Sequence, residues 1–513
     1  MSNTSHKDTI EFAGDYNLTN VVLHNHEGEG LTPDKKGHDI KQLVRELNIY
    51  ESIYQQAVTG SVVITDTTNL IGNLPIQGTE TLSFKVSTPG ANEQNHIIDA
   101  TQKSGHPFHV YKVANKKQLK DGMQAYTLHF ASREFMRNMR TRVSKAYSGR
   151  FDQIVASIFG DPNYLDSRKQ LNFQKTRNQD KIVIPNLHPF NAISMCSSRA
   201  LADDSKSTGY HFYETTKGFH FRSFESLLIT SAQQPRKAKQ VFRYVPMNVN
   251  EPNDENLPDT SESSPLKGNK KIMFDLQSVE SYKFINNIHD TALNTLMGTY
   301  GHRVLTHNLY NKSYNIADYD YHAYYDDTFH ADGKNNPAVV NTPVDYDNNS
   351  LGQYPDSRLS VQATSQFLHN EDTGMFGTNI EDDGITEAAR ISQLNQITNG
   401  ATLQLTVKGQ SYLEAGDVIE FQLRGVDHTN KQGNPDPQYA GRYVITKIRH
   451  RITGDDYRMV LQCTKDSVFK KYASQNLRSY PNSASRDSAV FQDINQYDDI
   501  ATTGAKKGFP YGL

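Results

Sequence analysis

The chain has 513 residues and a formal net charge of −3 at pH 7, and this length suits about three domains of ordinary size. The near-neutral total charge gives no indication of a general nucleic-acid coat or a membrane-surface protein, so any charge argument has to be local. The two cysteines, Cys196 and Cys463, provide no disulfide framework and fit a reducing compartment. We interpret Cys463 as a small buried side chain, because it keeps strand register with Leu461.

The N-terminus has no basic start followed by an apolar run, as a secretory signal would. No window of the sequence approaches the roughly 18 apolar residues of a membrane span. These observations predict a soluble protein that is made in a cytoplasm.

Two distant parts of the chain follow the same plan. Each has an alternating apolar strand, a polar turn, a Leu, and then a Gly before a second alternating strand that contains Phe. The matching segments are 60–86 with 403–423, 108–113 with 443–448, and 126–134 with 457–466. The sequence therefore predicts two related small β domains. Three chains that each carry two equivalent units would place six units around one axis, which indicates an adaptor rather than an enzyme.

The first β domain is predicted over residues 1–132. From Arg133 the apolar residues recur at helical spacing, and a mixed α/β domain is predicted over 133–271. Within it the patterns predict a strand at 181–186, a helix at 189–202 and a hairpin at 210–224. Residues 248–271 are rich in Asn, Pro, Asp and Ser and are predicted to form an exposed loop.

The second β domain is predicted to occupy two segments, 272–314 and 391–467. Its first segment suggests a helix that ends near Gly298 and a strand through Arg303, Leu305 and His307. Residues 315–390 are predicted to be an insertion. Residues 468–513 are polar and are predicted to be an extension without a core of its own.

Together these segments resemble the central baseplate hub protein of contractile-tailed bacteriophages, a family related to the first module of type VI secretion spike proteins. The resemblance covers most of the chain. It is carried by the segments 39–80, 183–200, 209–227, 405–421, 440–452 and 459–467. The long insertion and the polar tail depart from the typical pattern of the family, which leaves their partners open.

The resemblance implies an α+β fold with two homologous small antiparallel β-barrel tube domains beside the mixed α/β domain. It implies a homotrimer whose tube domains form a pseudo-hexameric ring and join the six-fold tail tube to the three-fold central spike. It also implies contacts with other baseplate proteins and a channel through which DNA passes without sequence recognition. The expected location is the tail baseplate of a virion assembled in the bacterial cytoplasm.

Four residues of the second β domain are predicted to determine turns rather than chemistry. Gly409 follows a strand, and Gly416 with Asp417 forms the turn before the next strand, where backbone angles that other residues adopt poorly are expected. Gly441 stands at the start of the following strand and is assigned the same role.

A basic stripe is predicted on the strand at 443–452, where Lys447, Arg449 and Arg451 alternate with apolar residues. The opposite side of the strand is predicted to hold Val444, Thr446, Ile448 and Ile452. The stripe has two interpretations. It faces a neighbouring subunit or a DNA channel, where it would contact phosphates without reading bases, or it is a solvated face. A strongly basic lining would hinder DNA that has to slide, because each phosphate contact adds affinity.

No motif for catalysis, a cofactor or a metal meets its usual requirements, and we predict none of these sites. Asp345, Asp347, Asn349 and Asp356 have the offsets of a calcium loop, but Ser350 replaces its Gly and Asp356 its bidentate Glu. Further metal ligands could be imagined among His24, His26, His322, Asp326, Asp327 and His330, without a second pair to fix a geometry. Phe509 and Tyr511 in the tail are candidates for binding a partner.

Three hypotheses follow for the function. The favoured one is a non-enzymatic hub adaptor. The second is another tube, ring or spike component of a contractile injection machine. The third is an enzyme whose site lies in the Tyr-rich insertion or the Asp345 loop. Oligomeric state and symmetry separate them, since a hub is a trimer and a tube subunit is a true hexamer.

Overall fold

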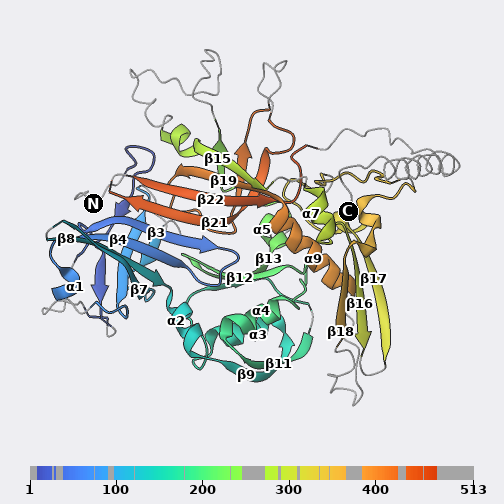
Figure 1. Cartoon of the computed structure of the whole chain (residues 1–513), viewed down its shortest axis with the longest axis horizontal. Helices are drawn as coiled ribbons and strands as arrows, with labels where there is room; N and C mark the ends of the chain where they lie inside the picture. Colours follow the sequence, from blue (N-terminus) through green and yellow to red (C-terminus); the bar gives the residue numbers. More distant parts are fainter. Residues whose placement is uncertain are drawn as a thin grey trace, which may run out of the picture.

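The computed structural model describes residues 9–470 except 26–27, 30–38, 74–75, 90–96, 121, 178, 231–232, 245–271, 287–289, 309–311, 334–335, 346, 365–383, 426–434 and 455. Within this part the fold is mostly antiparallel sheet with some helices, which agrees with the predicted α+β class. Figure 1 shows the N-terminal strands at one end of the molecule and the sheet of the insertion at the other.

The first β unit is built from alternating strands whose apolar side chains face one core. Its strands are β1 (Asn17–Leu18), β2 (Val22–His24), β3 (Val44–Ser52), β4 (Thr59–Asp66), β5 (Thr81–Ser87), β6 (Ile97–Ala100), β7 (Phe108–Lys120) and β8 (Met123–Ala131). A short helix, α1 (Leu70–Asn73), lies between β4 and β5. The main path through this unit runs β5-β7-β8-β4-β3.

The second β unit repeats this path as β20-β21-β22-β19-β15. Its strands are β15 (Val279–Asn286), β19 (Ala401–Lys408), β20 (Val418–Gln422), β21 (Gly441–Thr453) and β22 (Tyr457–Lys465). A further strand, β14 (Gln240–Arg243), pairs in parallel with β20, although its residues fall inside the range predicted for the mixed domain. The helix predicted to end near Gly298 is only α7 (Thr291–Leu296), and the residues before it form β15.

The two units agree down to their irregularities. In β3 a bulge falls between Val44 and Glu46, and in β15 it falls between Val279 and Ser281. The β7–β8 and β21–β22 pairs share a bulge in the same way, between Val110 and Lys112 and between Ile445 and Lys447. Because a bulge is a specific local feature, its repetition shows that one β unit occurs twice in the chain.

Cross-strand partners fix how the two units align. Gly60 pairs with Phe130, and Leu403 pairs with Cys463, so Gly60 corresponds to Leu403 as the sequence predicted. By the same register Tyr126 corresponds to Met459, whereas the sequence alignment matched Tyr126 with Tyr457. That alignment was two residues out of register at this point.

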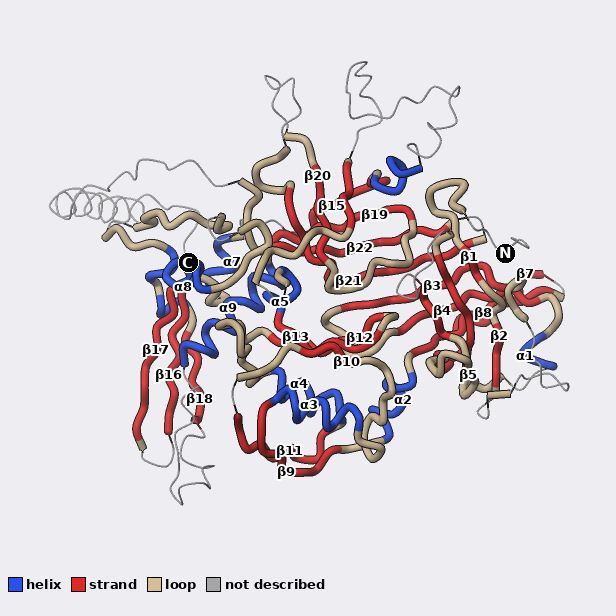
Figure 2. Tube along the Cα trace, turned by 180° about the vertical axis from the view of Figure 1, so that it is seen from behind, coloured by secondary structure: helices blue, strands red, loops and turns tan. Residues whose placement is uncertain are grey.

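A single continuous sheet contains both units, because β3 of the first pairs antiparallel with β21 of the second. One core of buried side chains runs beneath both units, from Leu47 and Phe130 to Leu405 and Met459. The described strands do not close into a barrel within one chain. The open sheet is seen from behind in Figure 2.

The mixed α/β domain follows the first unit and has its own core around Phe151, Ile193 and Phe219. Its helices are α2 (Arg133–Arg140), α3 (Phe151–Gly160), α4 (Pro189–Ser197) and α5 (Phe224–Leu228). Its strands are β9 (Val143–Arg150), β10 (Leu171–Phe173), β11 (Gln179–Leu187), β12 (Tyr210–Thr215) and β13 (Gly218–Ser223). The predicted hairpin is formed by β12 and β13, which turn at Thr216 and Lys217.

Between β15 and β19 the chain forms a separate three-stranded sheet. It contains β16 (Gly301–Asn308), β17 (Ser313–Asp320) and β18 (Leu359–Thr364), together with α8 (Tyr321–Tyr324), η2 (Tyr325–Asp327), η3 (Leu351–Gln353) and η4 (Pro355–Ser357). The strand predicted through Arg303 and Leu305 therefore exists, but it pairs with β17 and β18 rather than with the second β unit. Helix α9 (Gly384–Asn399) connects this sheet to β19.

Candidate functional site

The joint between the two β units is the candidate functional site. Seven residue pairs join β3 to β21, from Lys447 opposite Ser52 to Thr453 opposite Glu46. The two strands occupy different places in their units, because β3 corresponds to β15, and β21 corresponds to β7. The joint is therefore of the head-to-tail kind, which leaves one complementary edge free on each side.

Opposite charges lie across this joint. The two carboxylate oxygens of Glu46 are each 3.0 Å from a guanidinium, one of Arg449 and one of Arg451. The Nε of Arg449 also donates to Asn48 at 2.9 Å. Burial would raise the pKa of Glu46, but hydrogen bonds from Asn48 and Arg451 and the two positive charges outweigh burial and lower this pKa. Glu46 therefore remains ionised and neutralises part of the basic stripe.

The structure places the basic stripe on the polar side of the sheet. Ile448 and Ile452 belong to the core, so Lys447, Arg449 and Arg451 point the other way. Val444 does not share the side of Ile448 as predicted, because it packs in a different cluster, with Tyr213 and Leu227. The bulge between Ile445 and Lys447 adds one residue and reverses the alternation at that point.

Uncharged side chains surround the stripe. A shallow depression on this face is lined mostly by hydroxyl, amide and apolar side chains, and its lining residues include Tyr50, Thr59, Thr402, Gln404, Lys447, Arg449, Val460 and Gln462. The ammonium group of Lys447 lies 5.7 Å from the centre of the Tyr54 ring. At the joint, the ion pairs of Arg449 and Arg451 with Glu46 thus leave fewer positive charges to hold a phosphate.

Glu51 connects three parts of the molecule. This side chain lies on β3 and is 1% exposed. Its Oε1 accepts a hydrogen bond from Thr216 N of the β12–β13 turn at 2.8 Å, and its Oε2 accepts one from Ala415 N of the second β unit at 3.0 Å. Burial raises the pKa of Glu51 to about 7, against the effect of these hydrogen bonds. The mixed domain is thereby fixed at the joint between the units.

Two of the predicted turn glycines have a positive φ. Gly416 has φ +94°, and a Cβ there would overlap the hydroxyl of Tyr213. Gly441 has φ +112°, and a Cβ there would meet the carboxylate of Asp332. Both conformations favour glycine, and both positions are also closely packed.

Gly409 and Asp417 act differently. Gly409 has no positive φ, so the expected backbone reason does not apply; a Cβ would instead overlap the ring of Tyr457. The Oδ2 of Asp417 accepts a hydrogen bond from Glu414 N at 2.9 Å and lies 2.7 Å from Lys239 Nζ. Asp417 thus closes the turn before β20 with a side-chain hydrogen bond.

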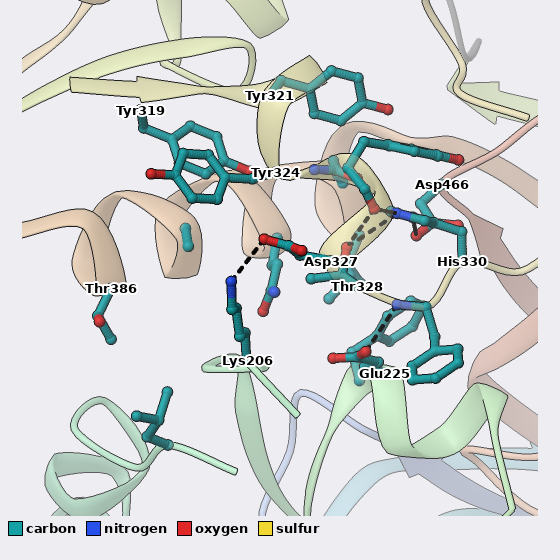
Figure 3. Close-up of a pocket in the computed structure, with 18 of the residues that line it drawn as sticks. Lys206, Glu225, Tyr319, Tyr321, Tyr324, Asp327, Thr328, His330, Thr386 and Asp466 are labelled. Atoms are coloured by element: carbon teal, nitrogen blue, oxygen red, sulfur yellow. Dashed lines mark hydrogen bonds and ion pairs between the residues drawn. The ribbon is translucent and has the colours of Figure 1, made fainter. Parts of the chain in front are cut away.

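A pocket of about 330 Å³ lies where the mixed domain, the insertion and α9 meet (Figure 3). In the figure Tyr319 and Tyr324 lie on one side, and their rings stack 5.2 Å apart. Lys206 pairs with Asp327 at 2.8 Å. This pocket is not predictable from the sequence as a unit, because its residues are spread from Arg177 to Asp466 and only the fold brings them together.

His330 of this pocket is held on both ring nitrogens. His330 Nδ1 lies 2.8 Å from Asp466, and its Nε2 lies 2.9 Å from the carbonyl of Tyr325. Burial lowers the pKa of His330, but Asp466 outweighs burial and raises it, which favours an ion pair. Since both ring nitrogens are engaged, His330 is not free to act as a general base. Neither serine nor cysteine is among the described residues that line the pocket.

The metal candidates do not converge on a shared centre in the described part of the chain. Asp345 accepts backbone hydrogen bonds from Asp347 and Asn349, whereas Asp356 pairs with Arg303. His322 Nε2 contacts the carbonyl of Val339. No group of three or more His, Cys, Asp or Glu suited to a metal ion was found among the described residues.

Several predictions concern residues outside the described part of the chain: His26, the loop at 248–271, Phe509 and Tyr511. Both cysteines are buried and free. No helix in the described ranges is long and apolar enough to cross a membrane.

Comparisons with known proteins found no protein-family model and no curated protein that matches the chain. Solved structures do match. One is the tail protein from Neisseria meningitidis, at 9% identity and a TM-score of 0.45, over 89% of this chain and 99% of that one. Another is the 43 kDa tail protein of prophage MuSo2 from Shewanella oneidensis, at 9% identity and a TM-score of 0.46, over 88% and 100% of the two chains.

A third is the E. coli c3393 protein, described as a component of the type VI secretion system, at 10% identity and a TM-score of 0.38, over 85% of this chain and 76% of that one. These neighbours are tail proteins and a secretion component. They belong to the classes of protein that the sequence resembles.

Proposed function

We propose that this protein is a non-enzymatic structural component of a contractile-tail baseplate, in which three copies form a ring of six equivalent β units. The observation that carries the proposal is the pairing of β3 with β21. It joins two units of one topology in a head-to-tail manner, and a head-to-tail joint that repeats from chain to chain closes into a ring when the rotation allows.

In this proposal the two β units are the tube domains, and they become barrel-like only in the ring. The first lies within residues 1–132, and the second consists of β15, β19, β20, β21 and β22 without β16 and β17. The six units face a six-fold tail tube. The three copies of the insertion and the C-terminal extension, with Phe509 and Tyr511, face a three-fold spike and other baseplate proteins. The duplication supports this role, because one chain then presents both symmetries.

The polar face of the sheet would line a channel for DNA. Its hydroxyl and amide side chains and the pairing of Arg449 and Arg451 with Glu46 support this assignment. A phosphate gains affinity from each unpaired cation that it meets. Neutralisation of Arg449 and Arg451 by Glu46 reduces the affinity of the lining for phosphate near the joint and so helps DNA to slide, and such a lining recognises no base sequence.

Electron cryomicroscopy of the assembled full chain tests the function. We expect a ring with six similar lobes at its inner wall and three insertions at its periphery. A ring with six insertions would show a true hexamer and assign the protein to the tube instead. Oligomeric particles of the full chain that contain no ring would contradict the proposed role as an adaptor.

A further inference from the structure

Two sheet edges have no partner strand in the described part of the chain. β15 pairs with β19 alone, and β7 from Tyr111 onward pairs with β8 alone. The corresponding edges of β3 and β21 are joined to each other inside the chain. The free edge of β15 is therefore equivalent to the edge of β3 in the internal joint, and the free edge of β7 is equivalent to that of β21. The two free edges lie at opposite ends of this run of strands.

We propose that β15 of one copy pairs with β7 of the next copy, and that lysines on both edges keep this junction open at low ionic strength. The proposal rests on the proposed ring and names the surfaces that close it. The occupant of each edge is a second copy of this chain, because the chain already contains the same joint between its own two units.

The internal joint also gives the register. Ala114 corresponds to Arg449, because both lie opposite equivalent residues of the neighbouring strand, Thr127 and Val460. Asn286 corresponds to Tyr50 by the same comparison across β19 and β4.

Arg449 lies opposite Tyr50, so Ala114 is expected opposite Asn286 of the next copy. The further bulge of β7 between Ala114 and Lys117 then places Lys117 opposite Lys283.

The charges at the two junctions differ. In the internal joint Glu46 of β3 neutralises Arg449 and Arg451 of β21. At the equivalent place β15 has Ser281 instead of a carboxylate. The acidic residue of β15, Glu280, already forms ion pairs with Lys408 and Arg458 of its own chain, at 3.1 and 3.3 Å.

The free edges are basic on both sides. Exposed lysines on these strands are Lys112, Lys116, Lys117, Lys120 and Lys283. Lysines on edge strands prevent unwanted pairing, and like charges directly opposite one another destabilise a strand pair. The charges are exposed, so salt weakens their repulsion, with a screening length of about 3 Å at 1 M and about 30 Å at 0.01 M. The equilibrium for ring closure should therefore be unfavourable at low salt and favourable at high salt.

A disulfide between copies tests the register. The variant Ala114→Cys with Asn286→Cys should form covalently linked copies under mild oxidation at about 1 M salt. A link within one chain is excluded, because six strands separate β7 from β15, roughly 30 Å along the sheet. Native Cys196 and Cys463 are fully buried and do not compete.

The matched control is Gln118→Cys with Asn286→Cys, which moves one thiol four residues along the same strand. Because of the bulge this displacement equals three residues of the partner strand, about 10 Å. It should remain unlinked, because a disulfide bridges Cα atoms no more than about 7 Å apart. The proposed junction would be overturned if both cysteine pairs formed the disulfide to the same extent. It would also be overturned if neither pair formed it in a protein shown to be a ring.

A charge exchange tests the lysines. Lys117→Glu or Lys283→Glu alone should lower the protein concentration for half-assembly at low salt by roughly tenfold, because attraction replaces repulsion at each junction. The double variant should lose this gain, since two carboxylates then face each other. Lys237→Glu makes the same change in net charge at an exposed position away from both edges and should have no such effect.

The outcomes separate this inference from the proposed function. A three-copy ring whose assembly ignores salt and these charges would overturn the charge control and leave the function standing. A three-copy ring without the predicted disulfide would place the junction elsewhere. A six-copy ring would overturn the proposed function, even if the same edges became linked.

Discussion

Gly416 combines two requirements at one turn, a left-handed backbone and close packing. Gly416→Val should destabilise the protein by about 2–4 kcal/mol. The substitution places a β-branched residue at φ +94°, and the valine side chain would overlap Tyr213. The measurement is thermal unfolding of the full chain. Gly105→Val is the matched control, since Gly105 has φ +75° and nothing within 4 Å of a Cβ. If both variants lose the same stability, packing against Tyr213 is unimportant.

Glu51 makes stability depend on pH. Its pKa is raised from its ordinary value of 4.5 to about 7, so the folded protein holds a proton that the unfolded chain has released between these values. The stabilisation of the folded protein by this bound proton is fully present below about pH 4.5 and is lost as the pH rises through about 7.

The unfolding temperature of the native protein should therefore fall between pH 5 and 7.5 relative to that of Glu51→Gln. Such a shift in pKa corresponds to about 3 kcal/mol. Parallel pH profiles of the two proteins would contradict the assignment.

The β3–β21 joint owes its strength to strands rather than to ion pairs. Arg451 is 43% exposed in its side chain and Glu46 is 23% exposed, so solvent weakens their attraction. A double-mutant cycle with Glu46→Gln and Arg451→Gln should give a coupling of at most about 1 kcal/mol, decreasing with salt. A coupling of several kcal/mol that salt does not change would mean that the ion pairs hold the units together.

The sequence predicted the duplication because strand alternation survives in both copies, as in 60–64 and 403–407. It did not predict the reversal at Val444 or the strand nature of β15, because a bulge breaks alternation without leaving a sequence signal. The assignment of Arg303 to the second β unit failed for another reason. Alternation shows that a strand exists, but its partner is decided by contacts distant in sequence.

As a whole, the molecule consists of two copies of one β unit in a shared sheet, with a mixed domain fixed at their joint and an insertion at one end (Figure 1). The pocket of Figure 3 lies between these parts, and its His330 is bound on both ring nitrogens. The grouping of its residues could not be predicted from the sequence, since the mixed domain, the insertion, α9 and the segment after β22 all supply lining residues. The proposed role in assembly rests on the shared sheet, in which β3 pairs with β21.

The mass of the full chain in solution shows directly whether three copies form a closed assembly. Light scattering should be measured over a range of protein concentrations, at low salt and at about 1 M salt, where surface charges are screened. The account predicts a closed assembly near three times the chain mass of 57.9 kDa at high salt. A closed assembly of six chains, or a single chain at every concentration and both ionic strengths, would contradict it.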